Sequence, residues 1–143
     1  YAYINDAGWQ NYGQSIATRP ENIETYSACF EKLVPLIQQS SVDYLTDPTH
    51  GNDVLIAAVN AFGGDFGWEY TQGTADFGAA KIKEEGLIAN GPDGVVGKFD
   101  MDRVADLIEK AVPIYTAQGA TPKDGVTPDD VVTNRFINES IGL

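Results

Sequence analysis

Apolar side chains recur along much of this chain at the three- and four-residue spacing of one face of an α-helix. The first such pattern begins at Thr18, where Thr18-Arg19-Pro20-Glu21 has the Thr-x-x-Glu spacing of a capping box, with Pro20 in the first turn of the predicted helix. The pattern continues to Ile37 and contains Pro35, which removes one backbone hydrogen bond and predicts a kink. A Pro- and Gly-containing stretch at residues 47–51 predicts the end of this helix.

Four further helices are expected downstream, which brings the predicted total to about five. Their predicted ranges are Asp53–Phe62, Thr74–Glu85, Met101–Tyr115 and Thr127–Phe136. The helix at 53–62 is apolar almost all round, so we expect it to be deeply buried. The helix at 101–115 has the clearest amphipathic stripe, and Asp100 is expected to cap its N-terminus.

The first residues of the chain have a different pattern. Tyr1–Asn5 is short, aromatic and β-branched, which predicts a strand. The backbone groups of a single strand need partners, so we expect the other strands of its sheet to lie upstream of Tyr1. The N-terminus has no initiating Met and no signal-peptide pattern, and we interpret it as a cut end. The predicted fold class is therefore α/β, with one strand and about five helices in residues 1–143.

Composition and charge narrow the function classes. The chain of 143 residues is 43% hydrophobic and 10% aromatic, which is typical of a globular domain. Its formal net charge is −12, so its surface repels phosphate backbones, and we expect no nucleic-acid partner.

The sequence carries none of the common catalytic motifs. It contains no Gly-x-Ser-x-Gly elbow, no phosphate-binding Gly-x-x-x-x-Gly-Lys loop, no Gly-x-Gly-x-x-Gly fingerprint and no His-Glu-x-x-His pair. The single histidine, His50, falls in a predicted loop, and the single cysteine, Cys29, is expected to be a buried thiol. The acidic residues near 90–102 do not have the spacing of a calcium loop. We therefore expect a protein that is not an enzyme and that uses no cofactor or metal.

Aromatic and amide side chains are concentrated in the first twelve residues. Flat rings beside short amides and a carboxylate suit a small polar or heteroaromatic solute, because rings stack on it while amides fix its orientation. The predicted ligand-binding residues are Tyr3, Asn5, Asp6, Trp9 and Asn11. Packing against other parts of the protein is the alternative role for these rings. A weaker second candidate comprises Phe66, Trp68 and Tyr70.

The chain resembles a known family over nearly its whole length, from about Trp9 to Leu143, and three runs of residues carry the resemblance. Residues 20–39, with Pro20-Glu21-Asn22-Ile23 and Leu33-Val34-Pro35-Leu36-Ile37-Gln38-Gln39, are similar to the long helix after the second interdomain crossover of ABC-transporter solute-binding proteins of the nitrate/taurine and thiamine-pyrimidine (NMT1/THI5-like) type. The runs Gly97-Lys98-Phe99-Asp100-Met101-Asp102-Arg103-Val104 and Asp130-Val131-Val132-Thr133-Asn134-Arg135-Phe136-Ile137 resemble the C-terminal end of the same proteins.

This resemblance implies a type II periplasmic-binding fold, in which two α/β lobes enclose a ligand cleft. The chain would be the mainly helical, C-terminal part of the first lobe, with the second lobe and the N-terminal part of the protein absent from it. Such proteins are exported, often as lipoproteins, and deliver a small solute to the membrane permease of an ABC importer. The chain is therefore expected to be an extracytoplasmic bacterial protein.

Two other functions remain open. One is an enzyme of the same fold, similar to the thiamine-pyrimidine synthases, although those work with histidine and iron chemistry and this chain has one histidine. The other is a free-standing helical interaction module, which would need its own core and an exposed apolar groove.

Overall fold

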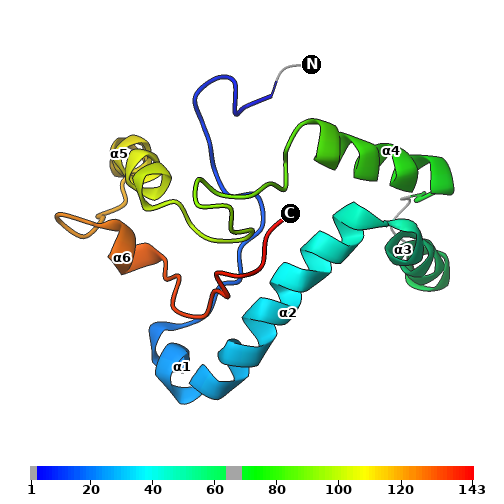
Figure 1. The fold of residues 1–143 in the computed structure, drawn as a ribbon. Helices are drawn as coiled ribbons and strands as arrows, with labels where there is room; N and C mark the ends of the chain where they lie inside the picture. The colour runs from blue at the N-terminus through cyan, green and yellow to red at the C-terminus, as the bar shows by residue number, and fades with distance from the viewer. Residues whose placement is uncertain (1–2, 64–68) are drawn as a thin grey trace. The chain divides into compact units, whose positions relative to one another are not determined.

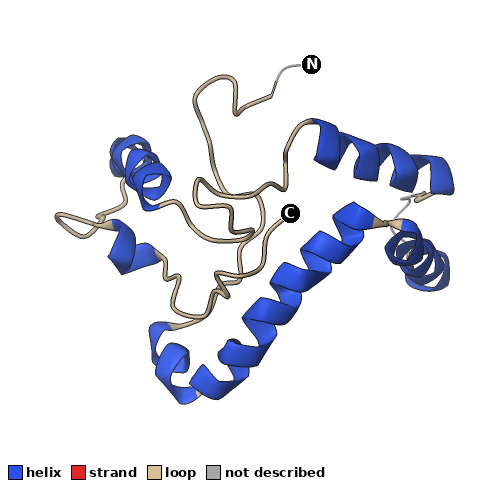
Figure 2. Cartoon of the chain, in the orientation of Figure 1, coloured by secondary structure: helices blue, strands red, loops and turns tan. Residues whose placement is uncertain are grey.

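A computed structural model describes residues 3–63 and 69–143 of the chain. Those residues contain six α-helices and no strand (Figures 1 and 2). The helices are α1 (Pro20–Thr25), α2 (Ser27–Thr46), α3 (Thr49–Phe62), α4 (Gln72–Glu84), α5 (Met101–Ala117) and α6 (Pro128–Val131). The chain divides into two compact units: unit 1 comprises Tyr1–Glu31 with Lys98–Phe136, and unit 2 comprises Lys32–Gly97 with Ile137–Leu143.

The prediction of a mainly helical chain is confirmed, with differences at the helix ends. The first predicted helix is two helices, because Tyr26 leaves the helical conformation at φ −113° and ψ 21°. Pro35 lies inside α2, which continues past it to Thr46. The predicted break at 47–51 is only two residues long, and there the side chain of Asp47 accepts a hydrogen bond of 3.0 Å from the backbone N–H of Thr49.

The predicted strand at Tyr1–Asn5 is wrong over its described residues; Tyr1 and Ala2 lie outside them. Residues 4–8 form turns instead, closed by hydrogen bonds from Asp6 N to Tyr3 O (3.1 Å) and from Gly8 N to Asn5 O (3.0 Å). These local bonds use backbone groups that a strand would have to pair with a neighbouring strand. The described part of the chain is therefore helical and not α/β.

In unit 1, α5 is the main helix and packs against α6. Asp100 caps α5 as predicted, because its carboxylate accepts hydrogen bonds from the N–H groups of Asp102 and Arg103. Val104, in the first turn, is buried. The predicted helix at 127–136 stops at Val131, since Val132 is extended and the Asn134 side chain bonds the backbone of Phe99 in both directions at 2.9 Å.

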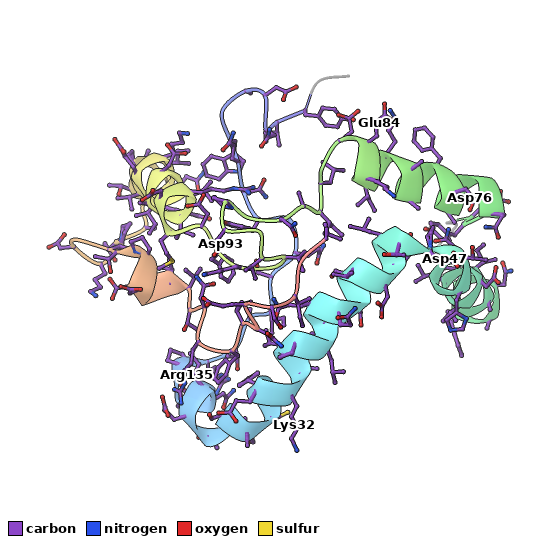
Figure 3. All side chains as sticks on the ribbon, viewed as in Figure 1. Lys32, Asp47, Asp76, Glu84, Asp93 and Arg135 are labelled. Carbon is purple, nitrogen blue, oxygen red and sulfur yellow. The ribbon has the colours of Figure 1, made fainter. Side chains whose placement is uncertain are left out.

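Another contact in unit 1 joins residues that are far apart in sequence. Arg135, which is labelled in Figure 3, forms an ion pair with Glu24 of α1. The rings of Phe30 and Phe136 lie 5.4 Å apart. These contacts hold the end of the 132–136 segment beside the first helices of unit 1.

In unit 2, Gln38 of α2 joins two loops. Its side-chain nitrogen donates to Val96 O at 2.8 Å and to Asn138 O at 3.3 Å, while its oxygen accepts from Asn138 N at 2.9 Å. The C-terminal residues are also fixed by a backbone hydrogen bond from Val96 to Ile141. Asn90 and Val96 form an isolated antiparallel β-bridge in the intervening turn.

Helices α3 and α4 pack together through polar side chains. Asn52 of α3 is 0% exposed, accepts from the Tyr44 hydroxyl at 2.9 Å and donates to Asp76 of α4 at 3.3 Å. Burial raises the pKa of Tyr44, and the nearby Tyr70 and Asp76 add to the shift. The face of α3 that carries Asn52 therefore points inward.

The predicted deep burial of the apolar residues of α3 is accordingly wrong. Val54 and Leu55 are 54% and 47% exposed, because the helix meets its neighbours on the side of Asn52. Both units expose further large apolar side chains, including Leu36, Phe77 and Tyr115. Among the described residues, the buried hydrophobic side chains are Leu45, Ala75, Val95, Val96 and Val104.

Candidate functional site

The predicted ligand-binding residues lie on one ordered segment of unit 1. The turns at residues 4–8 bring Tyr3, Asn5 and Asp6 close together, and a hydrogen bond of 3.2 Å from Trp9 N to Ile4 O closes the series. The rings of Tyr3 and Trp9 are half-buried, whereas the side chains of Asn5 and Asp6 are exposed. Asn11, two residues after Trp9, is also exposed.

Arg103 of α5 holds the middle of this segment. Its Nε donates to Gln10 O at 2.6 Å and its Nη2 donates to Asn11 O at 2.8 Å. The guanidinium carbon lies 4.2 Å from the centre of the Tyr12 ring, within range of a cation–π interaction. One side chain therefore contacts three consecutive residues.

Tyr12 is also fixed by the start of α5. Its hydroxyl accepts a hydrogen bond of 2.8 Å from Asp100 N, and its ring meets that of Phe99 edge-on with centres 4.9 Å apart. The face and the hydroxyl of this ring are thus engaged within the protein. Tyr12 anchors the segment.

Lys110 of α5 holds the other end of the segment. Its ammonium donates to Gly8 O at 2.8 Å and pairs with Asp106 at 2.6 Å. Lys110 and Arg103 were not among the residues predicted from sequence. The available signal was a pair of cations seven residues apart on a helix of a strongly acidic chain.

The predicted residues thus combine half-buried rings with exposed amide and carboxylate groups on one segment. Tyr3, Asn5, Asp6 and Trp9 share a short series of turns, and Asn11 extends from the part of the segment held by Arg103. The second candidate is not described in full, because Phe66 and Trp68 lie outside the described residues.

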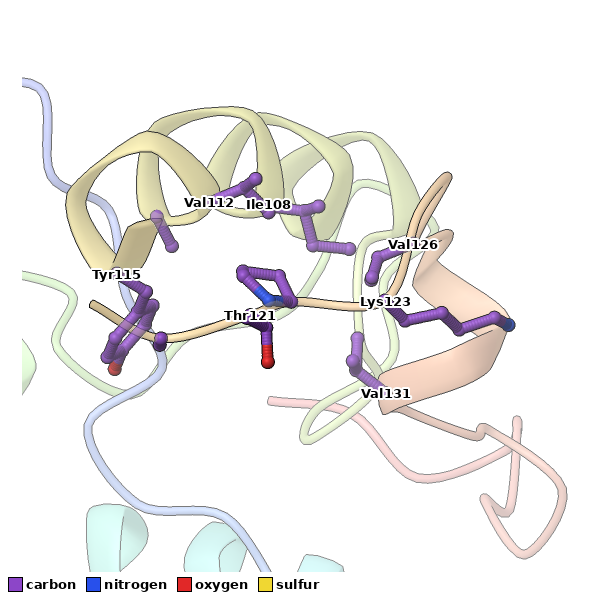
Figure 4. Close-up of a pocket in the computed structure, with 10 residues that line it drawn as sticks. Ile108, Val112, Tyr115, Thr121, Lys123, Val126 and Val131 are labelled. Atoms are coloured by element: carbon purple, nitrogen blue, oxygen red, sulfur yellow. The ribbon is translucent and has the colours of Figure 1, made fainter. Parts of the chain in front are cut away.

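An open hollow of about 370 Å³ lies elsewhere in unit 1, between α5 and residues 120–131 (Figure 4). Its lining is mostly apolar and includes Ile108, Val112 and Tyr115. None of the predicted ligand-binding residues lines it. At its edge, Lys123 pairs with Asp130, and this ammonium, with Thr127, lowers the pKa of Asp130 to about 2.

The single histidine and the single cysteine lie outside both the segment around Trp9 and the hollow beside α5. His50 is exposed in the first turn of α3. Cys29 is exposed on α2, so the prediction of a buried thiol is wrong; the neighbouring Phe30 takes the inward position. In the described ranges, no group of three or more His, Cys, Asp or Glu side chains could hold a metal ion. None of the described helices is long and apolar enough to cross a bilayer.

Comparison of the chain with protein-family models, with curated proteins and with solved structures finds no match. The resemblance to solute-binding proteins thus stays an interpretation of the sequence.

Proposed function

We propose that this chain is part of an extracytoplasmic solute-binding protein, which captures a small aromatic solute and delivers it to the membrane permease of an ABC importer. The observation that carries the proposal is the ordered segment around Trp9. It offers half-buried rings for stacking and exposed amides for hydrogen bonding, and it is fixed to α5 by Arg103 and Lys110. Because the backbone of this segment is already held in place, binding of a flat solute does not first have to order it.

The exposed apolar side chains support the idea that the chain packs against the rest of a larger protein. Contiguous exposed apolar surface usually marks an interface. Val54 and Leu55 of α3, with Leu36 of α2, are each about half exposed or more. Such residues suit helices that cover further layers of an α/β lobe, including an N-terminal part of the same protein. Exposed apolar side chains of this kind also suit the alternative function, a free-standing helical interaction module.

The charges around the segment select the kind of solute. The ammonium of Lys110 and two nitrogens of Arg103 already bond main-chain oxygens. Asp6 meanwhile presents an exposed carboxylate on the same segment. A neutral or cationic ring therefore fits this surface better than a sulfonate or nitrate anion.

Capture requires a second wall that closes over the solute. In a two-lobed binding protein, the solute binds the closed state more tightly than the open state and shifts the population toward it. The segment around Trp9 would supply one wall of that cleft, and a ring stacked on it would be excluded from water on closure. The chemistry of the site is binding alone.

The proposal is tested by a thermal-shift panel on the protein. Cytosine, thiamine and riboflavin represent neutral or cationic rings, and nitrate and ethanesulfonate represent anions. At least one ring compound should raise the Tm, because binding to the folded state alone stabilises it by mass action. The anions should not raise it.

A pair of variants locates the site. Trp9→Ala should remove the rise in Tm, whereas Tyr26→Ala, which alters another exposed aromatic residue of unit 1, should leave it intact. A panel without any rise, together with capture of a helical protein partner, would favour the interaction module. An undiminished rise in Trp9→Ala would remove Trp9 from the site.

A further inference from the structure

We infer that Arg103 and Lys110 are positioning residues, which set the place of Trp9 by holding residues 8–12 along α5. These five residues are called the strap here. The inference rests on the proposed function, since it assigns to these two cations the task of orienting the binding surface. Neither residue is expected to touch the solute.

The spacing of the two cations matches the strap. Arg103 and Lys110 are seven residues apart, so they are separated by roughly 10 Å along the axis of an α-helix. Their acceptors, Gly8 O and Asn11 O, are three residues apart, and an extended chain covers about 10 Å in three residues. Gly8 meets Lys110 and Asn11 meets Arg103, so the strap runs antiparallel to α5.

Trp9 lies between the two attachments. Lys110 holds the carbonyl of the residue before it, and Arg103 holds the carbonyl of the residue after it. Both donors are charged, and hydrogen bonds from charged donors are roughly twice as strong as those between neutral groups. The backbone that carries the indole is therefore held on both sides of Trp9.

The attachments use main-chain oxygens of the strap. The side chains of Gln10 and Asn11 are exposed and are not used by Arg103, which bonds only the carbonyl groups of these residues. The strap is thus fixed in place while its side chains stay accessible to a solute. A cation lost from either end should free Trp9 without breaking the helices.

The first test measures the fluorescence of Trp9 in the absence of any solute. The chain has two tryptophans, so a Trp68→Phe background makes Trp9 the single emitter. In that background, Arg103→Met and Lys110→Met should each shift the emission to longer wavelength and increase quenching by acrylamide. Arg135→Met and Lys123→Met are the matched controls, since both cations form ion pairs elsewhere in unit 1, and they should leave the Trp9 signal unchanged.

The variant Arg103→Lys tests whether the two hydrogen bonds of Arg103 are needed or whether a positive charge is enough. A single ammonium cannot reproduce the fork of a guanidinium, so its Trp9 signal should shift in the same direction as that of Arg103→Met. Trp9 signals in Arg103→Met and Lys110→Met equal to those of the controls would overturn the inference. A signal in Arg103→Lys equal to that of the unsubstituted protein would show that a single positive charge is enough and would refute the need for the two hydrogen bonds of Arg103.

The second test uses riboflavin and thiamine as probes. The rise in Tm that either gives should be smaller in Arg103→Met than in Arg135→Met. Equal rises in the two variants would show that Arg103 does not position the site. Failure of this inference can be told apart from failure of the proposed function. The fluorescence test of Arg103 and Lys110 needs no solute, whereas the proposed function fails only if no compound of the thermal-shift panel raises the Tm.

Discussion

Replacement of Gln38 by Ala should destabilise unit 2 strongly. Gln38 is 4% exposed and is the side chain through which α2 bonds both the 90–97 turn and the C-terminal segment. Alanine removes its three hydrogen bonds together. The shortest of the three is made to the carbonyl of Val96, a residue that is 2% exposed and so out of reach of bulk water.

The magnitude follows from these groups. Each hydrogen bond contributes about 1 kcal/mol net to stability, so the three bonds together contribute about 3 kcal/mol. We therefore expect the free energy of unfolding to fall by about 3 kcal/mol in Gln38→Ala. Gln39 is the matched control: it is the adjacent residue of the same type, exposed, with a side-chain hydrogen bond to Asp43. Gln39→Ala should cost less than about 0.5 kcal/mol.

The assay is urea unfolding followed by far-UV circular dichroism, with the free energy of unfolding obtained by linear extrapolation. The two variants should have clearly separated midpoints. The reasoning is refuted if Gln38→Ala is no less stable than Gln39→Ala, since Gln38 would then not join the two loops.

Three further predictions concern single positions. Gly142→Ala should lower the free energy of unfolding by about 1–3 kcal/mol, because its Cβ would lie 2.2 Å from Gly94 O, and urea unfolding measures the loss. The same substitution at Gly78, in the interior of α4 with nothing within 4 Å of the new Cβ, should instead raise it by about 0.5–1 kcal/mol; a loss there would contradict this. The carboxyl of Asp130 should titrate at about 2 by NMR and closer to 4 in Lys123→Ala, whose hydrogen bond is the largest cause of the shift. Since this pKa is lower in the folded state than in the unfolded state, its contribution to stability is present above about pH 4 and is lost as the pH falls toward 2.

Helix positions were largely predictable from sequence because their signals are local. The N-cap of α5 at Asp100 and the amphipathic stripe after it depend on neighbouring residues alone. The strand predicted at 1–5 is wrong over its described residues, because Asn5 and Asp6 favour turns and Gly8, at φ +90°, lets the chain turn back. The burial of α3 failed because composition does not show which face meets a neighbour, and here that face carries Asn52.

The site was predictable only in part. The aromatic and amide residues are adjacent in sequence, so their clustering is visible without a structure. Arg103 is 92 residues from Asn11, and a contact across that distance leaves no periodic signal. Helical spacing alone does not reveal the role of Arg103, because from the sequence a cation on α5 is expected to be a solvated side chain.

The attachment of the strap by carbonyl oxygens has a consequence for how specificity can change. Every residue type has the same carbonyl, so substitutions at Trp9, Gln10 or Asn11 leave the docking on α5 intact. Under the proposed function, selectivity for one solute over another would change by exchange of these three side chains, while the attachment of the strap to α5 stays the same.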